Sequence, residues 1–415
     1  MSRFCTLLLC LCVLFTSASS PAQVRAGSDP ALHLQPEIVL DGDPFDVSTG
    51  IYYREYADLF VPDSIPIVFS RTQRTLDDRS RAFGIGGSTS YDMFIIGDVN
   101  NFSWVALVMP DGSQARFTRI SPGHSYVNGV FEDRSDPSEF RGAQISWGPQ
   151  ASWNVRLLNG TVYTVQGCGA SSKPGQCAVV AIQNAKGDRL TIKRDRDGNI
   201  ERILSPHGHF VDVKTDPQGR ITHASTDSGQ WVDYVYDEKG CLSRVQNWRR
   251  DLQVFGYDDR SNMVSISEKG TDSKGPYHFT IRNRYDAQNR FAGQLVSTGQ
   301  KAAVTYQTSS TGHIVEADVN DGATLARHFF DEAGWITKED LRLGARSLWQ
   351  LDYVRGVPTH DLQDLLLTCP SGKLHIPLDA ARNITQMGDE RKQYLRQVCQ
   401  RAAAPRPALK PAAQQ

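Results

Sequence analysis

Asp216-Pro-Gln-Gly219-Arg-Ile221 is one of six related motifs between Leu190 and Ile336. The others are Asp195-Arg-Asp-Gly198-Asn-Ile200, Tyr236-Asp237-Glu-Lys-Gly240-Cys-Leu242, Tyr257-Asp258-Asp-Arg-Ser-Asn262-Met-Val264, Tyr285-Asp286-Ala-Gln-Asn289-Arg-Phe291 and Phe330-Asp331-Glu-Ala-Gly334-Trp-Ile336. The first four aspartates are each 21 residues apart, and a degenerate copy spans residues 306–314. A fixed period of about 20 to 50 residues indicates a repeat architecture.

Each motif combines turn chemistry with an alternating run before it. Trp231-Val-Asp-Tyr-Val-Tyr236 has the period of two that is typical of a half-buried strand. The aspartate accepts hydrogen bonds from the backbone two residues on, and the glycine, or Asn262 and Asn289 in two copies, tolerates positive φ. The pattern therefore predicts β-hairpins stacked side by side, because a lone hairpin cannot bury its apolar face.

The motif resembles the YD repeat of the RHS family. The repeat-motif residues that carry the resemblance are Asp195, Gly198, Asp216, Gly219, Tyr236, Asp237, Gly240, Tyr257, Asp258, Tyr285, Asp286, Asp331 and Gly334. The resemblance implies an all-β fold in which stacked hairpins form a long curved or spiral sheet, as part of an RHS-type shell. The Pro-Asp-Pro-x-Gly core and the toxin domain of full-length members are not found, so we expect neither self-cleavage nor a closed shell with a cargo.

A second stretch, roughly Leu40 to Ile96, resembles the domain of unknown function that commonly opens RHS proteins. The matching positions are Asp43-Pro44, Val47, Thr49-Gly50, Asp58-Leu59, Pro62, Phe69-Ser-Arg71-Thr72 and Phe83-Gly84, with Gly87 where the family usually has Trp. Short strands broken by Gly, Pro and Asp agree with this interpretation. We assign residues 38–166 to this N-terminal RHS-associated β domain.

The first residues predict export. Arg3 and the apolar run from Phe4 to Phe15, followed by small residues, are typical of a secretory signal peptide over residues 1–22. Residues 23–37 form a polar linker, and no later stretch is apolar and long enough to span a membrane. We therefore expect a bacterial protein in the periplasm, at the cell surface or outside the cell. The formal net charge of −1 gives no electrostatic reason to expect nucleic acid as a partner.

Five of the eight cysteines lie outside the predicted signal peptide. In an oxidising compartment disulfides are expected, and Cys168 with Cys177, and Cys369 with Cys399, are the candidate pairs. Cys241 is then left as a free thiol or a site of intermolecular pairing. No C-x-x-C spacing supports a zinc site.

The pattern changes after the repeat array, which we place at residues 190–355, following a Cys-bridged loop and connection at 167–189. Helical spacing at 360–367 and 389–399 predicts a short helical cap over residues 356–401. The Ala/Pro-rich tail, 402–415, is expected to be disordered.

No catalytic, metal or cofactor site can be nominated. His207 and His209 would share one face of a strand, but no third metal ligand is evident. The run around Asp195 and Asp197 only partly follows a calcium loop, and Asp41, Asp43 and Asp46 are better explained by a hydrogen-bonded turn. No nucleophile elbow, P-loop, Rossmann fingerprint or HExxH motif occurs, so we expect the protein not to be an enzyme.

The sequence therefore favours an exported, non-enzymatic RHS/YD-repeat scaffold that binds glycans or another surface protein. Trp, Tyr and Arg side chains suit such contacts if they are exposed, although they can equally fill the core of the sheet. The alternative is an orphan shell component, or partner, of a polymorphic RHS toxin-delivery system.

Overall fold

The computed structural model describes residues 24–25, 45–98, 100–134, 140–167, 174–357, 362–378 and 389–403. Within these ranges, 26 strands form one sheet, four form a second and two form a third. This architecture confirms the predicted all-β class and the long curved sheet of stacked hairpins. The predicted signal peptide, most of the linker, and the tail from residue 404 lie outside the described residues.

The large sheet follows the order of the chain, with each strand from β8 to β32 antiparallel to the next. Its strands before the repeats are β1 (Val24–Arg25), β8 (Phe94–Gly97), β9 (Trp104–Val108), β10 (Ser113–Arg119), β11 (Val130–Glu132), β12 (Gln144–Gly148), β13 (Ser152–Arg156), β14 (Val162–Gln166) and β15 (Val179–Gln183). A short 3₁₀ helix, η1 (Pro174–Cys177), precedes β15.

The repeat strands continue the same order. They are β16 (Arg189–Arg194), β17 (Ile200–Leu204), β18 (Phe210–Thr215), β19 (Ile221–Thr226), β20 (Trp231–Tyr236), β21 (Leu242–Asn247), β22 (Leu252–Tyr257), β23 (Met263–Asp272), β24 (Gly275–Tyr285), β25 (Phe291–Val296), β26 (Lys301–Thr308), β27 (Ile314–Asn320), β28 (Leu325–Phe330), β29 (Ile336–Leu343), β30 (Arg346–Arg355), β31 (Leu362–Cys369) and β32 (Gly372–His375).

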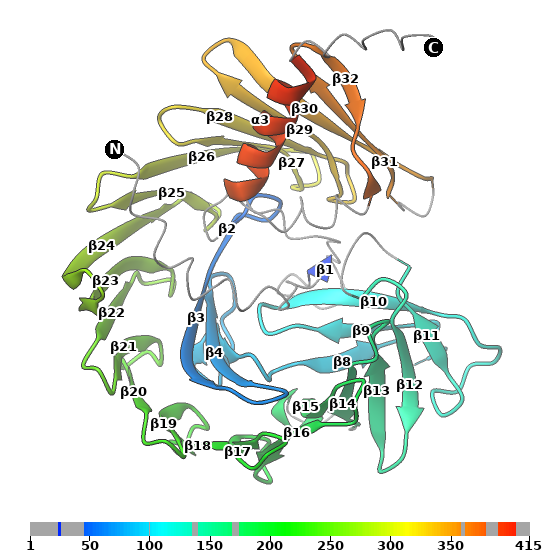
Figure 1. The fold of residues 1–415 in the computed structure, drawn as a ribbon, viewed down its shortest axis with the longest axis vertical. Helices are drawn as coiled ribbons and strands as arrows, with labels where there is room; N and C mark the ends of the chain where they lie inside the picture. The colour runs from blue at the N-terminus through cyan, green and yellow to red at the C-terminus, as the bar shows by residue number, and fades with distance from the viewer. Residues whose placement is uncertain are drawn as a thin grey trace, which may run out of the picture.

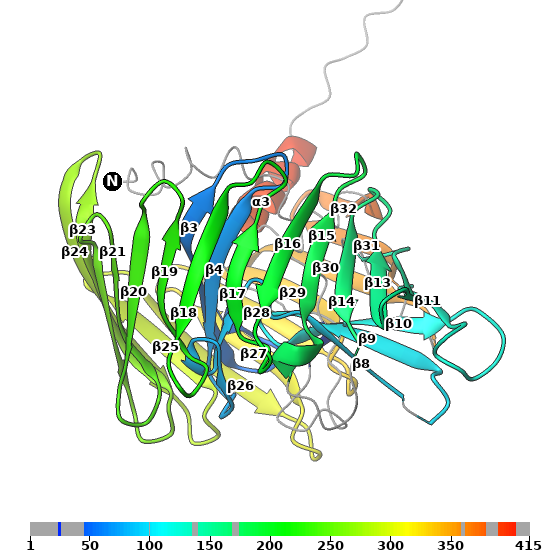
Figure 2. The same cartoon turned by 90° about the horizontal axis from the view of Figure 1, so that it is seen from below.

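The large sheet curls around an inner layer formed by residues 45–91 (Figure 1). This inner layer contains β2 (Phe45–Asp46), β3 (Ile51–Val61), β4 (Ile67–Arg74), β5 (Ser80–Arg81), β6 (Gly84–Ile85) and β7 (Gly87–Thr89). Figure 2 shows the strands from β13 to β20 side by side, forming a wall beside β3 and β4. The core therefore lies between the concave face of the sheet and the inner layer.

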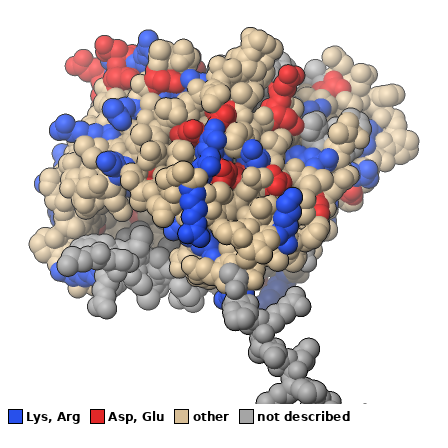
Figure 3. Space-filling view, turned by 90° about the horizontal axis from the view of Figure 1, so that it is seen from above, with Lys and Arg blue, Asp and Glu red and all other residues tan. Residues whose placement is uncertain are grey.

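Alternation along each repeat strand fixes which side chains enter this core. In β20, Val232 and Tyr234 are buried, whereas Asp233 and Val235 are exposed. Because successive side chains point to opposite faces, one face of the strand packs inward and the other meets solvent. Figure 3 shows acidic and basic side chains interspersed over the outer surface seen from above.

The repeat motif closes the turn at one end of each hairpin, as Asp216 illustrates. Its carboxylate accepts hydrogen bonds from the backbone N–H groups of Gln218 (3.0 Å) and Arg220 (2.9 Å), and from Arg220 Nε (2.7 Å). Gly219 has φ of +80°, and its N–H donates to the Asp216 carbonyl at 2.9 Å. Both backbone-to-carboxylate bonds recur at Asp195, Asp258, Asp286 and Asp331. Asp237 accepts the second of them, from Cys241 N at 2.8 Å.

The prediction that Asn262 takes the positive φ of its turn was wrong. Ser261, not Asn262, has positive φ (+62°) in its turn, while Asn289 does take the glycine position with φ of +66°. Asn262 instead donates from Nδ2 to Asp258 Oδ2 at 2.9 Å, the position that Arg220 fills in the turn of Asp216. At the fifth position the Asn262 side chain thus adds a donor to the carboxylate, and the residue before it takes the positive φ.

The motif tyrosines tie each unit to the one before it. The hydroxyl groups of Tyr236, Tyr257 and Tyr306 donate to the backbone carbonyls 15 residues earlier, at 2.6, 2.9 and 2.7 Å. Tyr285 makes the equivalent bond to the Met263 carbonyl at 2.9 Å. Burial raises the pKa of these phenols, so they remain donors at neutral pH.

The helical interpretation of residues 360–367 was wrong. Leu362–Cys369 forms β31, which pairs with β30, and alternate side chains from Leu365 to Cys369 are buried. A leucine-rich run of this length fits a helix or a buried strand, and the neighbouring edge of β30 decides between them.

The second predicted helix is present as α3 (Asp389–Ala403). Leu395 is fully buried, and Arg391 Nη1 lies 2.7 Å from Glu339 Oε1 of β29. The helix therefore packs on the inner face of the sheet. Within the described ranges, no helix is long and apolar enough to cross a membrane.

The cysteines largely follow the predicted scheme. A disulfide joins Cys369 to Cys399 and so fastens α3 to β31. Cys177 is disulfide-bonded, and Cys168, its predicted partner, lies outside the described residues. Cys241 is a free thiol, and because it is fully buried, burial raises the pKa of the thiol and hinders intermolecular pairing.

Candidate functional site

Three backbone hydrogen bonds join the inner layer to the repeat turns. Phe291 N donates to the Gly50 carbonyl (2.7 Å), and Ile221 N donates to the Ala82 carbonyl (2.7 Å). In the opposite direction, Ile85 N donates to the carbonyl of Gly240 at 3.1 Å. The inner layer thus pairs with backbone groups at the ends of three separate hairpins.

Gly50 and Gly84 make this close approach sterically feasible. Both have positive φ, +71° and +79°. A Cβ on Gly84 would lie within 3.0 Å of the Gly240 carbonyl oxygen, and one on Gly50 would lie 2.5 Å from the Cβ of Arg290. These positions therefore require glycine for both conformation and space.

A buried ion pair, Asp58–Arg71, lies where the inner layer faces the repeats. Arg71 Nε lies 2.9 Å from Asp58 Oδ2, and the two side chains are 2 % and 7 % exposed. Tyr234 of β20 donates its hydroxyl to the same carboxylate oxygen at 2.8 Å, and Arg71 Nη2 donates to Gln253 of β22. Burial raises the pKa of Asp58 even though Arg71 and Tyr234 act to lower it.

Aromatic rings and a second carboxylate extend this network. The Arg71 guanidinium stacks 4.1 Å from the centroid of the Tyr56 ring. The Tyr56 hydroxyl donates to Glu268 Oε1 of β23 at 2.6 Å, and Arg54 Nη2 donates to the same oxygen at 3.2 Å. Burial raises the pKa of Tyr56 well above its usual range. These buried polar contacts thus form a joint between the inner layer and the repeat strands β20, β22 and β23.

His207 and His209 do not share a face of a strand, contrary to the sequence prediction. Both lie in the turn between β17 and β18, and each Nδ1 contacts a different aspartate, Asp63 for His207 and Asp227 for His209. Within the described ranges, no group of three or more His, Cys, Asp or Glu side chains could hold a metal ion.

The acidic segment near the start of the inner layer is a hydrogen-bonded turn. Asp46 accepts from the N–H and hydroxyl of Ser48 (2.9 and 2.7 Å) and from the hydroxyl of Thr49 (2.6 Å). Asp41 and Asp43 lie outside the described residues. For Asp46, the interpretation as a turn is confirmed.

The tryptophans are less accessible than a carbohydrate platform would require. None of the seven is exposed. Arginines stack over four of the half-buried rings, with Arg116 over Trp104, Arg250 over Trp231, Arg249 over Trp248 and Arg355 over Trp335. A cavity is therefore a better candidate for a binding site than these rings.

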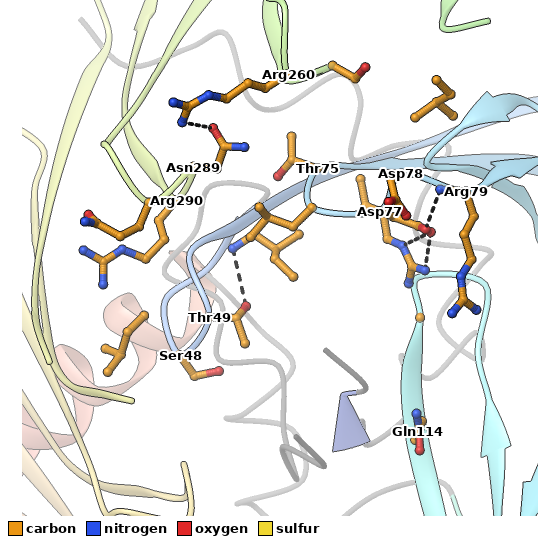
Figure 4. A pocket seen from close by; sticks show the side chains of 18 of the residues that line it. Ser48, Thr49, Thr75, Asp77, Asp78, Arg79, Gln114, Arg260, Asn289 and Arg290 are labelled. Carbon is orange, nitrogen blue, oxygen red and sulfur yellow. Dashed lines mark hydrogen bonds and ion pairs between the residues drawn. The ribbon is translucent and has the colours of Figure 1, made fainter. Parts of the chain in front are cut away.

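A pocket of about 820 Å³ lies between the inner layer, the hairpin β9–β10 and the repeat turns (Figure 4). Residues 74–81 form one wall, and the turns at 260–261, 288–290 and 308–314 form another. The third wall comes from β8 to β10 and includes Gln114. Its volume is within the range of about 300–1,000 Å³ that small-molecule sites occupy.

Arginines dominate the charges of this pocket. Arg74 and Arg81 both contact Asp77 Oδ2, at 2.6 Å for Arg81 Nε. Burial raises the pKa of Asp77, but the two guanidinium charges outweigh this effect and hold the pKa below its usual value. Asp77 therefore stays ionised at neutral pH.

The opposite wall contributes Arg260 and Arg290. Arg290 Nε donates to Asp286 Oδ2 at 2.7 Å, and its guanidinium lies 4.6 Å from the centroid of the Tyr306 ring. Arg260 Nη1 donates to two neutral oxygens, the Ala287 carbonyl (3.3 Å) and Asn289 Oδ1 (3.2 Å). The repeat turn thus supplies both structural bonds and a charged lining.

Residues 42–117 match DUF6531, a domain of unknown function. The DUF6531 segment contains Gly50, Asp58, Arg71 and Gly84, so the residues that dock the inner layer lie within it. It also contains the pocket wall at 74–81. None of the curated proteins matches this chain.

Three solved structures show weak similarity. A TcdB2–TccC3 structure without its hypervariable C-terminal region is 10 % identical, covers 74 % of this chain and 21 % of its own, and has a TM-score of 0.28. A Tc holotoxin pore of Photorhabdus luminescens is 10 % identical over 78 % of this chain and 21 % of its own, with a TM-score of 0.24. A porin-like protein of Bacteroides uniformis is 9 % identical over 64 % and 97 %, with a TM-score of 0.24.

Scores this low do not establish a common fold. The chain spans about a fifth of the length of the TcdB2–TccC3 chain to which it is similar.

The pocket arginines were missed by the sequence prediction of sites. The DUF6531 segment has Arg71, Arg74, Arg79 and Arg81 within eleven residues, which was a readable signal of concentrated positive charge. Arg260 and Arg290 gave no such signal, because they stand alone in separate repeat turns and only the curl of the sheet brings them to the pocket.

Proposed function

We propose that this protein is an exported, non-enzymatic scaffold of the RHS type that binds carbohydrate at the cell surface or in the periplasm. The repeat motifs and the DUF6531 segment support the RHS assignment. The expectation of export rests on the apolar run from Phe4 to Phe15. The pocket between the inner layer and the repeat turns replaces exposed aromatic residues as the proposed binding surface.

The observation that carries this proposal is a pocket built from three distant parts of the chain and held by fixed bonds. The Gly50–Phe291 and Ala82–Ile221 backbone bonds anchor the inner layer next to the pocket. Backbone bonds of this kind hold the walls of the pocket in place, and a rigid site loses less entropy on binding.

The lining suits a hydroxylated ligand. Beside its arginines and aspartates it contains Ser48, Thr75, Gln114, Asn289 and Thr308, whose side chains offer donors and acceptors to hydroxyl groups. Apolar side chains, among them Ile51, Phe94 and Ile314, lie between these polar groups. A purely hydrophobic ligand would leave the polar groups unpaired.

Screening the purified protein on a glycan array tests the proposal, with a variant that fills the pocket as the control. The substitution Thr311→Trp places a large side chain in the lining at an exposed turn position. We expect the wild type to retain a defined set of glycans and this variant to lose them. Retention of no glycan by the folded wild type would reject carbohydrate binding, and retention of the same glycans by the variant would reject the pocket.

A further inference from the structure

We infer that the pocket takes an acidic saccharide, with Arg79 on one wall and Arg260 on the opposite wall as the residues that recognise its anionic groups. This inference rests on the proposed carbohydrate-binding function and specifies its ligand class. Among the described lining residues, five arginines face two aspartates, so the lining is cationic although the whole chain has a formal net charge of −1.

The two aspartates do not neutralise the pocket. Asp77 is bound by both Arg74 and Arg81, so one carboxylate serves two guanidinium groups. Asp78 is the second acidic side chain of the lining, and it is exposed. At least two further arginines remain for a ligand.

Arg79 is one of these arginines. It is exposed, and it forms no ion pair with any described residue. Its backbone N–H donates to Asp77 Oδ1 at 3.2 Å, which fixes the position of the main chain from which its side chain extends. Figure 4 shows Arg79 at the wall opposite the repeat turns.

Arg260 is the other. It is exposed, and the two hydrogen-bond partners of its Nη1, the Ala287 carbonyl and Asn289 Oδ1, are neutral. These two bonds hold the guanidinium in place, and no carboxylate of the described residues cancels its charge. A positioned guanidinium without a counter-ion is the arrangement that binds carboxylate and sulfate groups.

The chemistry shared by uronate and sulfated sugars is a planar or tetrahedral oxyanion beside several hydroxyl groups. The arginines match the oxyanion, and the Thr, Asn and Gln side chains of the lining match the hydroxyls. The pocket volume of about 820 Å³ admits a short oligosaccharide and excludes a folded protein domain.

Isothermal titration of the full chain with three probes tests the inference. The probes are α-1,4-linked trigalacturonate, the neutral galactose trimer with the same linkage, and inorganic sulfate. We expect trigalacturonate to bind at least about tenfold more tightly than the neutral trimer, because each charged hydrogen bond contributes about a tenfold gain.

Arg79→Gln and Arg260→Gln are each expected to weaken trigalacturonate binding about tenfold and to leave the affinity for the neutral trimer within about twofold. Arg282→Gln is the matched control, since Arg282 is exposed on β24 and is not part of the lining. It removes the same charge and should change neither affinity. Circular dichroism of each variant checks that it is folded.

The outcomes separate the two proposals. Equal affinity for both trimers, or acidic binding that neither pocket substitution weakens, overturns the acidic ligand while carbohydrate binding stands. Binding of sulfate without either trimer overturns the saccharide and leaves a bare anion site. If no probe binds but the array retains neutral glycans, only the inference fails; if the array also retains none, both fail.

Discussion

Replacing Arg71 by methionine removes the cation at the centre of the joint between the inner layer and the repeats. Methionine keeps most of the unbranched stem, so the substitution mainly removes the charge and its hydrogen bonds. Asp58 then remains 7 % exposed with Tyr234 as its neutral partner. The side-chain carbonyl of Gln253 also loses its hydrogen bond from Arg71 Nη2.

The loss of folding stability in Arg71→Met has two contributions. Breaking a buried ion pair from one side costs about 3–5 kcal/mol, because an uncompensated charge remains in the core. Loss of the guanidinium from its stack 4.1 Å above the Tyr56 ring adds about 1 kcal/mol. At about 2 °C per kcal/mol for a large domain, we expect Tm to fall by about 8–12 °C.

Thermal unfolding followed by circular dichroism measures this loss, with Arg282→Met as the surface control. Changes at exposed positions away from special contacts are usually within about 0.5 kcal/mol, so the control should leave Tm nearly unchanged. In the double variant Asp58→Leu/Arg71→Met no charge is left unpaired, and we expect a loss well below the sum of the two single losses. A fall below about 2 °C in Arg71→Met, or additive losses in the double variant, would refute the reasoning.

The pH dependence of the variant gives an independent check. Burial already raises the pKa of Asp58 in the folded wild type, and loss of Arg71 removes the cation that opposes this rise. A carboxyl group with a raised folded pKa binds more protons in the folded than in the unfolded state, so stability falls as pH rises through that window. The difference in the free energy of unfolding between the wild type and Arg71→Met should therefore become smaller as the pH is lowered.

Four further predictions concern other contacts. Tyr257→Phe should cost about 1 kcal/mol in chemical denaturation, because it deletes one hydrogen bond between successive units. Gly84→Ala should destabilise the protein by about 1–3 kcal/mol more than Gly229→Ala. Both glycines have similar positive φ, but only a Cβ on Gly84 would meet a backbone oxygen, that of Gly240. Equal losses of stability would contradict the close approach of Gly84 to the repeat turn. Cys399→Ser opens a disulfide with a sequence separation of 30 and should cost about 3–4 kcal/mol, with proteolysis reporting whether α3 is released. The hydrogen bond to Asp63 raises the pKa of His207 in the folded protein. The wild type should therefore be more stable than His207→Asn below the ordinary histidine pKa, and this difference should vanish as pH rises through the raised pKa. A stability difference that does not depend on pH would reject the ion pair.

The repeat units could be predicted because their bonds are local. The carboxylate of Asp216 binds groups two and four residues further along, so the motif itself contains almost every partner that the turn needs. The period of 21 residues then predicts that the hairpins stack, since each has only its neighbours to cover its apolar face. The one error within the motif, Asn262 in place of Ser261, concerned which of two adjacent residues takes positive φ.

The segment at 362–369 shows where a local pattern is insufficient. Its leucines satisfy helical spacing and strand alternation alike, and the unpaired edge of β30 selects the strand. At 389–403 no strand pairing competes, and the segment forms the helix that its spacing indicates.

The sequence by itself determined the hairpin, its turn and its repetition, because these depend on contacts within a few residues or between successive units. Only the tertiary structure decided that the DUF6531 segment lies inside the curl, that Asp58 meets Tyr234 across 176 positions, and that Arg79 and Arg260 line one pocket. Such contacts depend on how far the sheet curls, and that curvature is the sum of small twists over many strands. No single motif specifies that sum, so residues far apart in the chain become neighbours only once the whole sheet has formed.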